Sequence, residues 1–199
     1  MTIVPNRLGV KFNLKREPAL AAADIVPIFQ RWIQEHTVDG MLIDVIDYKH
    51  VPEGPGVILI ADEGDYAFDF SDGQIGLHYI RKRNLPGDMA GALILAFRLA
   101  LGAALCLESE APGDIDFDFS HAKISFLDRQ NYRNEPARFA AAQDELSAIL
   151  ADIYGGDVAL ERAYDDPRFS FALRVSAQTE GVDGQKLLAR LSARAVSVQ

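Results

Sequence analysis

The stretch from Asp88 to Glu108, DMAGALILAFRLALGAALCLE, constrains the fold of this chain more than any other. Between its acidic ends only Arg98 is charged, and no polar face appears at helical spacing. A surface helix is apolar along one stripe, whereas a helix that is apolar all round is buried or lies in a membrane. The sequence therefore predicts a buried central helix over residues 88–108, with Asp88 as its N-cap. One side of this helix is smooth and the other bulky: Ala92, Ala96, Ala100 and Ala104 against Leu93, Ile94, Phe97, Leu101 and Leu105.

The same stretch is long enough to cross a bilayer, which takes about 20 apolar residues. Arg98 at its centre would cost roughly 2.5–3.5 kcal/mol on insertion. Many of the other residues are alanine and glycine, which contribute little transfer energy, and the flanking segments have the pattern of ordinary soluble strands. We therefore expect a core helix and no membrane partner.

Composition limits the class of protein. The formal net charge is −9 over 199 residues, and the acidic excess is spread over both halves of the chain. With no segregated basic face, binding to a nucleic-acid backbone is not expected. Cys106 is the only cysteine, which excludes an intramolecular disulfide and fits a reducing compartment. The first 15 residues lack the apolar core of a signal peptide. These features predict an acidic, cytoplasmic protein.

From Met41 to Arg83 every local signal favours β structure. A strand is expected over 41–51, and the wholly apolar segment 57–61 is expected to be a central strand. Two-residue turns at Glu63-Gly64 and Asp72-Gly73 would close hairpins. They predict three cross-strand rows that face the core under the central helix: Leu59, Phe68 and Leu77; Val57, Phe70 and Ile75; Ala61, Tyr66 and Tyr79. The reverse face is mixed.

Further elements lie on both sides of this meander. Alternation predicts a half-buried strand over 10–15, with Lys11 on its polar side, and a helix from Asp24 that Gly40 closes. Alternation of Asp with Ile or Phe predicts a strand over 114–119 that turns at Ser120-His121. A helix capped by Asn134, a hairpin turning at Asp166-Pro167 and a last helix over 183–195 follow.

Because hairpins dominate, the sequence predicts an α+β fold. Its mostly antiparallel sheet would comprise the four-stranded meander and two further hairpins, with helices packed on one face and the helix 88–108 buried at the centre. Residues 1–111 would form an N-terminal α+β half. Residues 112–199 would form a ββαββα half that either stands apart or continues the same sheet. The element order also suits a ferredoxin-like split βαβ with an inserted hairpin.

The sharpest candidate site is the loop after residue 47. It places Tyr48, His50 and Glu53 around a Gly/Pro turn at a strand end. A histidine near a carboxylate can act as a general base, and the glycines would let a ligand approach the backbone. Alternation sends Asp47 to the face opposite His50, however, so Asp47 cannot readily orient it. The competing interpretation is a rigid hairpin loop with a histidine packed beside an aromatic ring.

His78 is the second candidate, on the reverse face of the meander. Gly76 and Ala67 leave room beside it for a ligand pocket. The competing interpretation is a cross-strand pair with Asp69 on the neighbouring strand.

No metal or cofactor is expected. Asp114, Asp116, Asp118 and His121 resemble metal ligands, but Phe119 occupies the position where a calcium loop needs glycine. Carboxylates on one strand face lie about 6.5–7 Å apart, too far to share an ion. No dinucleotide-binding, phosphate-loop, nucleophile-elbow or zinc-protease motif occurs.

The segments RWIQ (31–34), IDVIDYKHVPEGPGVILI (43–60) and EGDY (63–66) resemble a family of uncharacterised bacterial proteins. The resemblance covers about residues 28–83 and, more loosely, the apolar helix. It implies a bacterial, cytosolic setting and carries no activity, ligand or site residue.

Two functional hypotheses follow. The first is a non-enzymatic protein that acts through homo-oligomerisation or partner binding, with its mixed sheet face or a helix surface as the interface. The alternative is a small-molecule-binding domain or enzyme with a pocket near His50 at the end of the meander.

Overall fold

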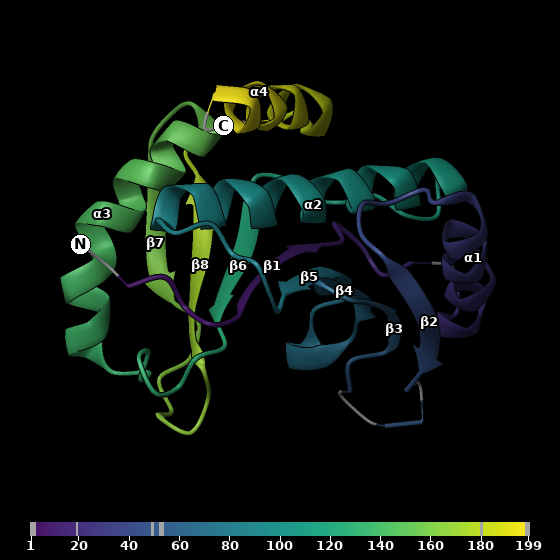
Figure 1. Ribbon diagram of the computed structural model, residues 1–199, viewed down its shortest axis with the longest axis horizontal. Helices are drawn as coiled ribbons and strands as arrows, with labels where there is room; N and C mark the ends of the chain where they lie inside the picture. Colours follow the sequence, from purple (N-terminus) through teal and green to yellow (C-terminus); the bar gives the residue numbers. More distant parts are fainter. Residues whose placement is uncertain (1–2, 19, 49, 52–53, 180, 198–199) are drawn as a thin grey trace.

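The computed structural model describes residues 3–18, 20–48, 50–51, 54–179 and 181–197 (Figure 1). The described residues form one eight-stranded sheet and four helices, with a short turn of 3₁₀ helix, η1 (Ser71–Gly73). The helices are α1 (Ala22–Glu35), α2 (Met89–Glu110), α3 (Pro136–Tyr154) and α4 (Gly184–Ser197). The strands are β1 (Leu8–Asn13), β2 (Leu42–Asp47), β3 (Val57–Ala61), β4 (Gly64–Asp69), β5 (Gly76–Arg81), β6 (His121–Phe126), β7 (Val158–Arg162) and β8 (Phe171–Ala177).

The strand order across the sheet is β2-β3-β4-β5-β1-β6-β8-β7. Every pairing is antiparallel, which confirms the predicted α+β class. The first strand of the chain lies between β5 and β6, so strands from both halves share one sheet. Because all neighbours are antiparallel, β5 and β6 run parallel on either side of β1 and are joined by α2, while α1 joins the parallel strands β1 and β2. This is the order of the split βαβ alternative with an inserted hairpin, with its last strand at His121–Phe126 and not at 114–119.

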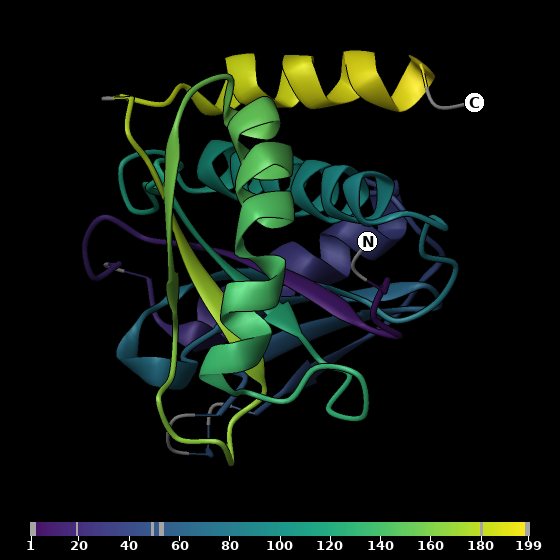
Figure 2. The ribbon, with the colours of Figure 1, turned by 90° about the vertical axis from the view of Figure 1, so that its left-hand side faces the viewer.

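The helices gather on one face of the sheet. Helix α2 lies against β1 and β5, α1 packs on β2 and β3, and α3 packs on β7 (Figure 1). Helix α4 lies on the side of α2 that points away from the sheet (Figures 1 and 2). By length and composition α2 could cross a membrane, but 61% of its most apolar window is buried within this fold. The predicted central core helix is confirmed.

The start of α2 is fixed by Asp88. Its Oδ1 accepts a hydrogen bond from the backbone N–H of Gly91 at 2.8 Å. We expect Asp88→Ala to lower the free energy of unfolding by about 1 kcal/mol, because a helix N-terminal N–H then loses its acceptor. Urea unfolding of Asp88→Ala beside Asp88→Asn tests this, since asparagine caps equally well. Equal losses in the two variants would contradict a capping role.

The register of the meander is partly as predicted. Phe68 faces Leu77 and Tyr66 faces Tyr79, which confirms the β4–β5 rows. Between β3 and β4 the prediction is wrong by two residues, because Leu59 faces Tyr66 and the chain turns at 62–63. Gly64 belongs to β4, where a Cβ would lie 2.5 Å from the hydroxyl of Tyr79. That glycine therefore permits close packing and does not form the turn. A shift of two keeps every residue on its predicted face.

Three other predictions are corrected. Residues 114–119 form an irregular segment joined to the end of β1 by a bridge between Leu14 and Phe117, and are not a strand of a hairpin. A turn at Asp166-Pro167 predicts Leu160 opposite Leu173, but Leu160 faces Val175, so the β7–β8 register is also shifted by two and the connection is longer than predicted. Helix α1 ends at the left-handed residue His36, whose N–H bonds to Trp32, and not at Gly40.

Candidate functional site

The face of the sheet opposite the helices, here called the outer face, carries a continuous row of polar side chains. Register places His78, Lys11, Lys123, Arg174 and Glu161 side by side on β5, β1, β6, β8 and β7. Antiparallel sheets often expose one polar face to water. Here the β4–β5 turn instead covers part of the row and shields it from solvent.

Lys11 is at the centre of this closed region. Its side chain is 0% exposed, although alternation alone places it on the solvent side of β1. The ammonium group lies 2.8 Å from Asp69 Oδ2 and 3.0 Å from Asp72 Oδ1. It also donates to the carbonyl oxygens of Ser71 and Gln74, at 3.2 and 2.5 Å. A buried ammonium needs this complete set of acceptors.

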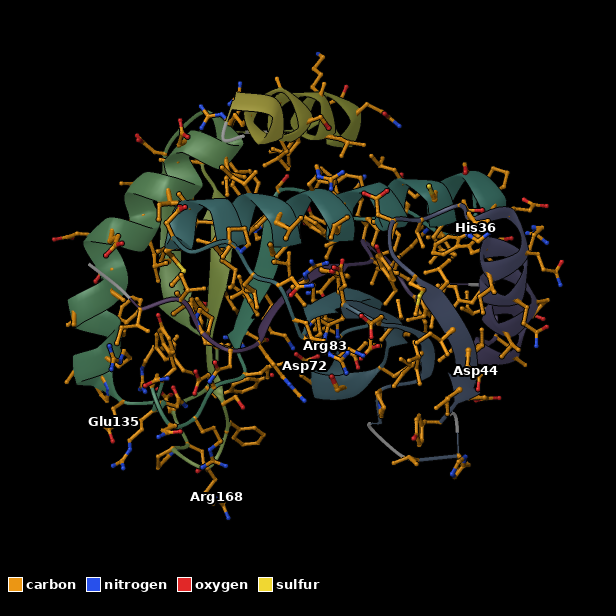
Figure 3. All side chains as sticks on the ribbon, in the orientation of Figure 1. His36, Asp44, Asp72, Arg83, Glu135 and Arg168 are labelled. Carbon is orange, nitrogen blue, oxygen red and sulfur yellow. The ribbon has the colours of Figure 1, made fainter. Side chains whose placement is uncertain are left out.

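The turn that supplies these acceptors has an uncommon backbone. Asp72 has a φ of 61° and Gly73 a φ of 69°, the pair of left-handed conformations that a tight hairpin turn of the type I′ class requires. This conformation places Asp72 on the outer face, on the side of the sheet away from α2 (Figure 3). Lys123 and the Tyr164 hydroxyl both donate to Asp72 Oδ2, so the turn is bonded to β1, to β6 and to the loop after β7.

The acids of this cluster are ionised. Burial acts to raise the pKa of Asp69, but Lys11, His78 and the hydrogen bonds from Lys11 and Ser71 outweigh it and hold that pKa below its ordinary value. The pKa of Asp72 is also lowered, because the bonds and charges of Lys123 and Lys11 exceed the effect of burial.

His78, a predicted site residue, borders this cluster. Its side chain is 12% exposed and lies over Gly9, where a Cβ would come within 2.5 Å of Nε2. Burial lowers its pKa to about 4, although Asp69, 3.8 Å from Nδ1, acts to raise it. Nε2 is buried and has no hydrogen-bond partner among the described residues. This geometry favours the predicted pairing with Asp69 over a pocket, because little of the ring is open to a ligand.

The other predicted site residues lie elsewhere. The rings of Tyr48 and His50 are 6.3 Å apart at the end of β2, and Glu53 lies outside the described residues. His78 shares a cross-strand row with Ile46 of β2, three strand spacings away, or about 14 Å. The structure therefore does not bring His78 together with Tyr48 and His50.

The acidic segment forms separate pairs. Asp116 binds Lys15 at 2.8 Å, and Asp118 binds His121 at 2.8 Å. Across the part of the chain that the structure describes, no three metal-ligating side chains come together.

A second feature of the outer face was only partly anticipated as a mixed surface. On β2 to β5 the outer face carries aliphatic residues among Asp44, Asp65, Asp69 and His78. We call the aliphatic set the aliphatic patch: Ile46, Ile58, Ile60, Ala67 and Ile80. Its rim carries large exposed apolar residues, because Met41, Ile43, Tyr48 and Val51 are 66%, 54%, 36% and 41% exposed. Alternation reveals the isoleucines, but only the completed topology shows that no helix covers them.

No protein-family model and no curated protein matches this sequence. The predicted bacterial relationship therefore stays a prediction.

Proposed function

We propose that the protein is a non-enzymatic binding module that pairs with a second copy of itself through the aliphatic patch. One observation carries the proposal: α1, α2 and α3 pack on the same face of the sheet and α4 lies above α2, so β2 to β5 present isoleucines on a face without a helical cover. Outward positions of a one-sided antiparallel sheet are usually polar. A contiguous apolar patch of this kind marks an interaction surface.

Face-to-face contact is favoured over extension of the sheet at β2. The register of β2 shifts at residues 42–44, a β-bulge that disrupts the regular ladder of its edge. Asp44, at this edge of the molecule, adds a charge to the strand (Figure 3). Bulges and charges are features that block pairing between sheet edges.

Apolar self-complementarity, and not charge, favours a second copy as the partner. Two chains of net charge −9 repel each other, so they associate best where unpaired acids are few. Beside the patch, Asp65 is neutralised by Lys82 at 2.7 Å. An aliphatic surface is also complementary to itself across a two-fold axis, and homodimer interfaces are more apolar than transient ones.

Light scattering after size-exclusion chromatography tests the proposal. We expect the wild-type chain to have about twice the mass of the 21.9 kDa protomer, and Ile46→Lys or Ile58→Lys to shift it toward the protomer mass. Thermal melts of each variant at low concentration check that the fold is retained.

Ala159→Lys provides the matched control, because Ala159 is exposed on the outer face of β7, at the far edge of the sheet. It should leave the mass unchanged. A monomeric wild-type chain at high concentration would overturn the proposal, as would equal disruption by the control substitution.

A further inference from the structure

A groove lies on the opposite side of the molecule from the aliphatic patch, between α2, α4 and the segment that follows α1. Its volume is about 410 Å³, within the range of small-molecule sites. Residues of α2 form the floor and residues of α4 form one wall. Helix α4 lies on the side of α2 that points away from the sheet (Figures 1 and 2). The apolar lining consists of Val38, Leu99, Gly102, Ala103, Leu105, Cys106 and Leu188.

Gly102 keeps the floor of this groove open. A Cβ at this position would meet no other atom within 4 Å, so packing does not require glycine here. Glycine in the middle of a helix is nevertheless less stable than alanine. Gly102 leaves open space above this turn of α2, and the groove therefore has room there for a bound chain.

Among the residues that the structure describes, Arg98 provides the one cation in the groove lining. Its Nη1 pairs with Asp39 Oδ2 at 3.0 Å, while its Nε–H is buried and has no hydrogen-bond partner among the described residues. The Arg98 side chain is 29% exposed and lines the groove, and a guanidinium binds a carboxylate or phosphate through parallel N–H hydrogen bonds. Asp39 is 62% exposed, so solvent weakens its hold on Arg98.

We propose that this groove binds an amphiphile with an unbranched alkyl chain and a single anionic head group. The head group bonds to Arg98, and the chain lies over Gly102 toward Leu105 and Cys106, one further turn along α2. This site is independent of the proposed self-association, which uses the other face of the sheet.

Isothermal titration calorimetry with decanoate below its micellar concentration tests the proposal. We expect one molecule per chain, with at least tenfold weaker binding of decanol, which lacks the charge. Decyl phosphate distinguishes the source of the head group: tighter binding than decanoate would indicate a phosphorylated amphiphile, and weaker binding a fatty acid. Equal affinity for decanol and decanoate would overturn the proposal.

Two pairs of variants separate ligand binding from a structural role. Gly102→Phe should abolish binding by filling the groove, while Gly102→Ala should retain it. Arg98→Gln should weaken decanoate binding roughly 10- to 100-fold, the value of a lost charged hydrogen bond. Asp39→Asn breaks the same ion pair but keeps the guanidinium, so the affinity of this variant for decanoate should equal or exceed that of the wild-type protein. Similar losses in Arg98→Gln and Asp39→Asn would assign only a structural role to Arg98 and overturn the proposal.

Cys106 offers a second readout in the same groove. It is the only cysteine of the chain and is partly exposed, so its alkylation reports on this site alone. Decanoate should slow alkylation by N-ethylmaleimide in the wild-type protein and in Ile46→Lys, but not in Gly102→Phe. Unchanged alkylation at saturating decanoate would contradict a chain that lies over Cys106.

Discussion

Replacing Lys11 with methionine is expected to lower the free energy of unfolding by about 3–5 kcal/mol, the largest loss among the substitutions considered. The Lys11 side chain is 0% exposed and pairs with Asp69, whose side chain is 3% exposed. Methionine fills similar space without a charge, so Asp69 would remain a buried anion without its main cation. Urea unfolding monitored by circular dichroism measures the loss.

Lys15→Met is the matched control, just beyond the end of β1. Lys15 pairs with Asp116 at the same 2.8 Å, but the two side chains are 54% and 46% exposed. Exposed pairs contribute at most about 1 kcal/mol, so this variant should remain near wild-type stability. The double variant Lys11→Met/Asp69→Asn should recover part of the loss, because the unpaired charge is gone. Losses of equal size for Lys11 and Lys15 would show that the closed cluster does not stabilise the fold.

The sequence pattern does not predict that Lys11 is buried. Alternation with Val10 and Phe12 correctly assigns Lys11 to the outer face and predicts that it meets water there. What covers it is the β4–β5 turn, about 60 residues later in the chain. The Asp72-Gly73 turn signal was recognised from its residue types, but the direction in which Asp72 points depends on the neighbours of β5. Those neighbours include β1, a pairing that no local signal encodes.

The elements that were predicted well depend on local signals. Helix α2 follows from its apolar length and its Asp88 cap, and the β4–β5 register follows from a turn with two left-handed residues. The β3–β4 register fails because Gly64 was assigned to a turn, whereas it is small to accommodate Tyr79. A glycine at a strand end can either form the turn or make room for a side chain of a neighbouring strand. Only the packing of that third strand distinguishes the two roles. The predicted faces are nevertheless correct, because side chains along a strand alternate between the two faces of the sheet and the register error is two residues.

The stability of the protein is expected to fall by about 3 kcal/mol as the pH decreases from 6.5 to 4, chiefly because of His78. Burial lowers the pKa of His78 from 6.5 to about 4 in the folded chain. Between these values the unfolded chain binds a proton that the folded chain does not, so the free energy of unfolding rises with pH across this window. Below pH 4 both states are protonated at this residue. Asp69 and Asp72, whose pKa values are lowered, lose their contribution only at still lower pH.

Urea unfolding at a series of pH values in wild-type and His78→Gln protein isolates this effect. In the variant, stability should no longer rise between pH 4.5 and 6.5, since His78 is absent and the pKa of Glu108, which burial raises, acts in the opposite direction. His121→Gln is the control, because the His121 side chain is 58% exposed. It should keep the wild-type slope. Parallel slopes of stability against pH for wild-type and His78→Gln would mean that the His78 ring is hydrated in the folded chain. A ligand pocket beside His78 would then again be a candidate site.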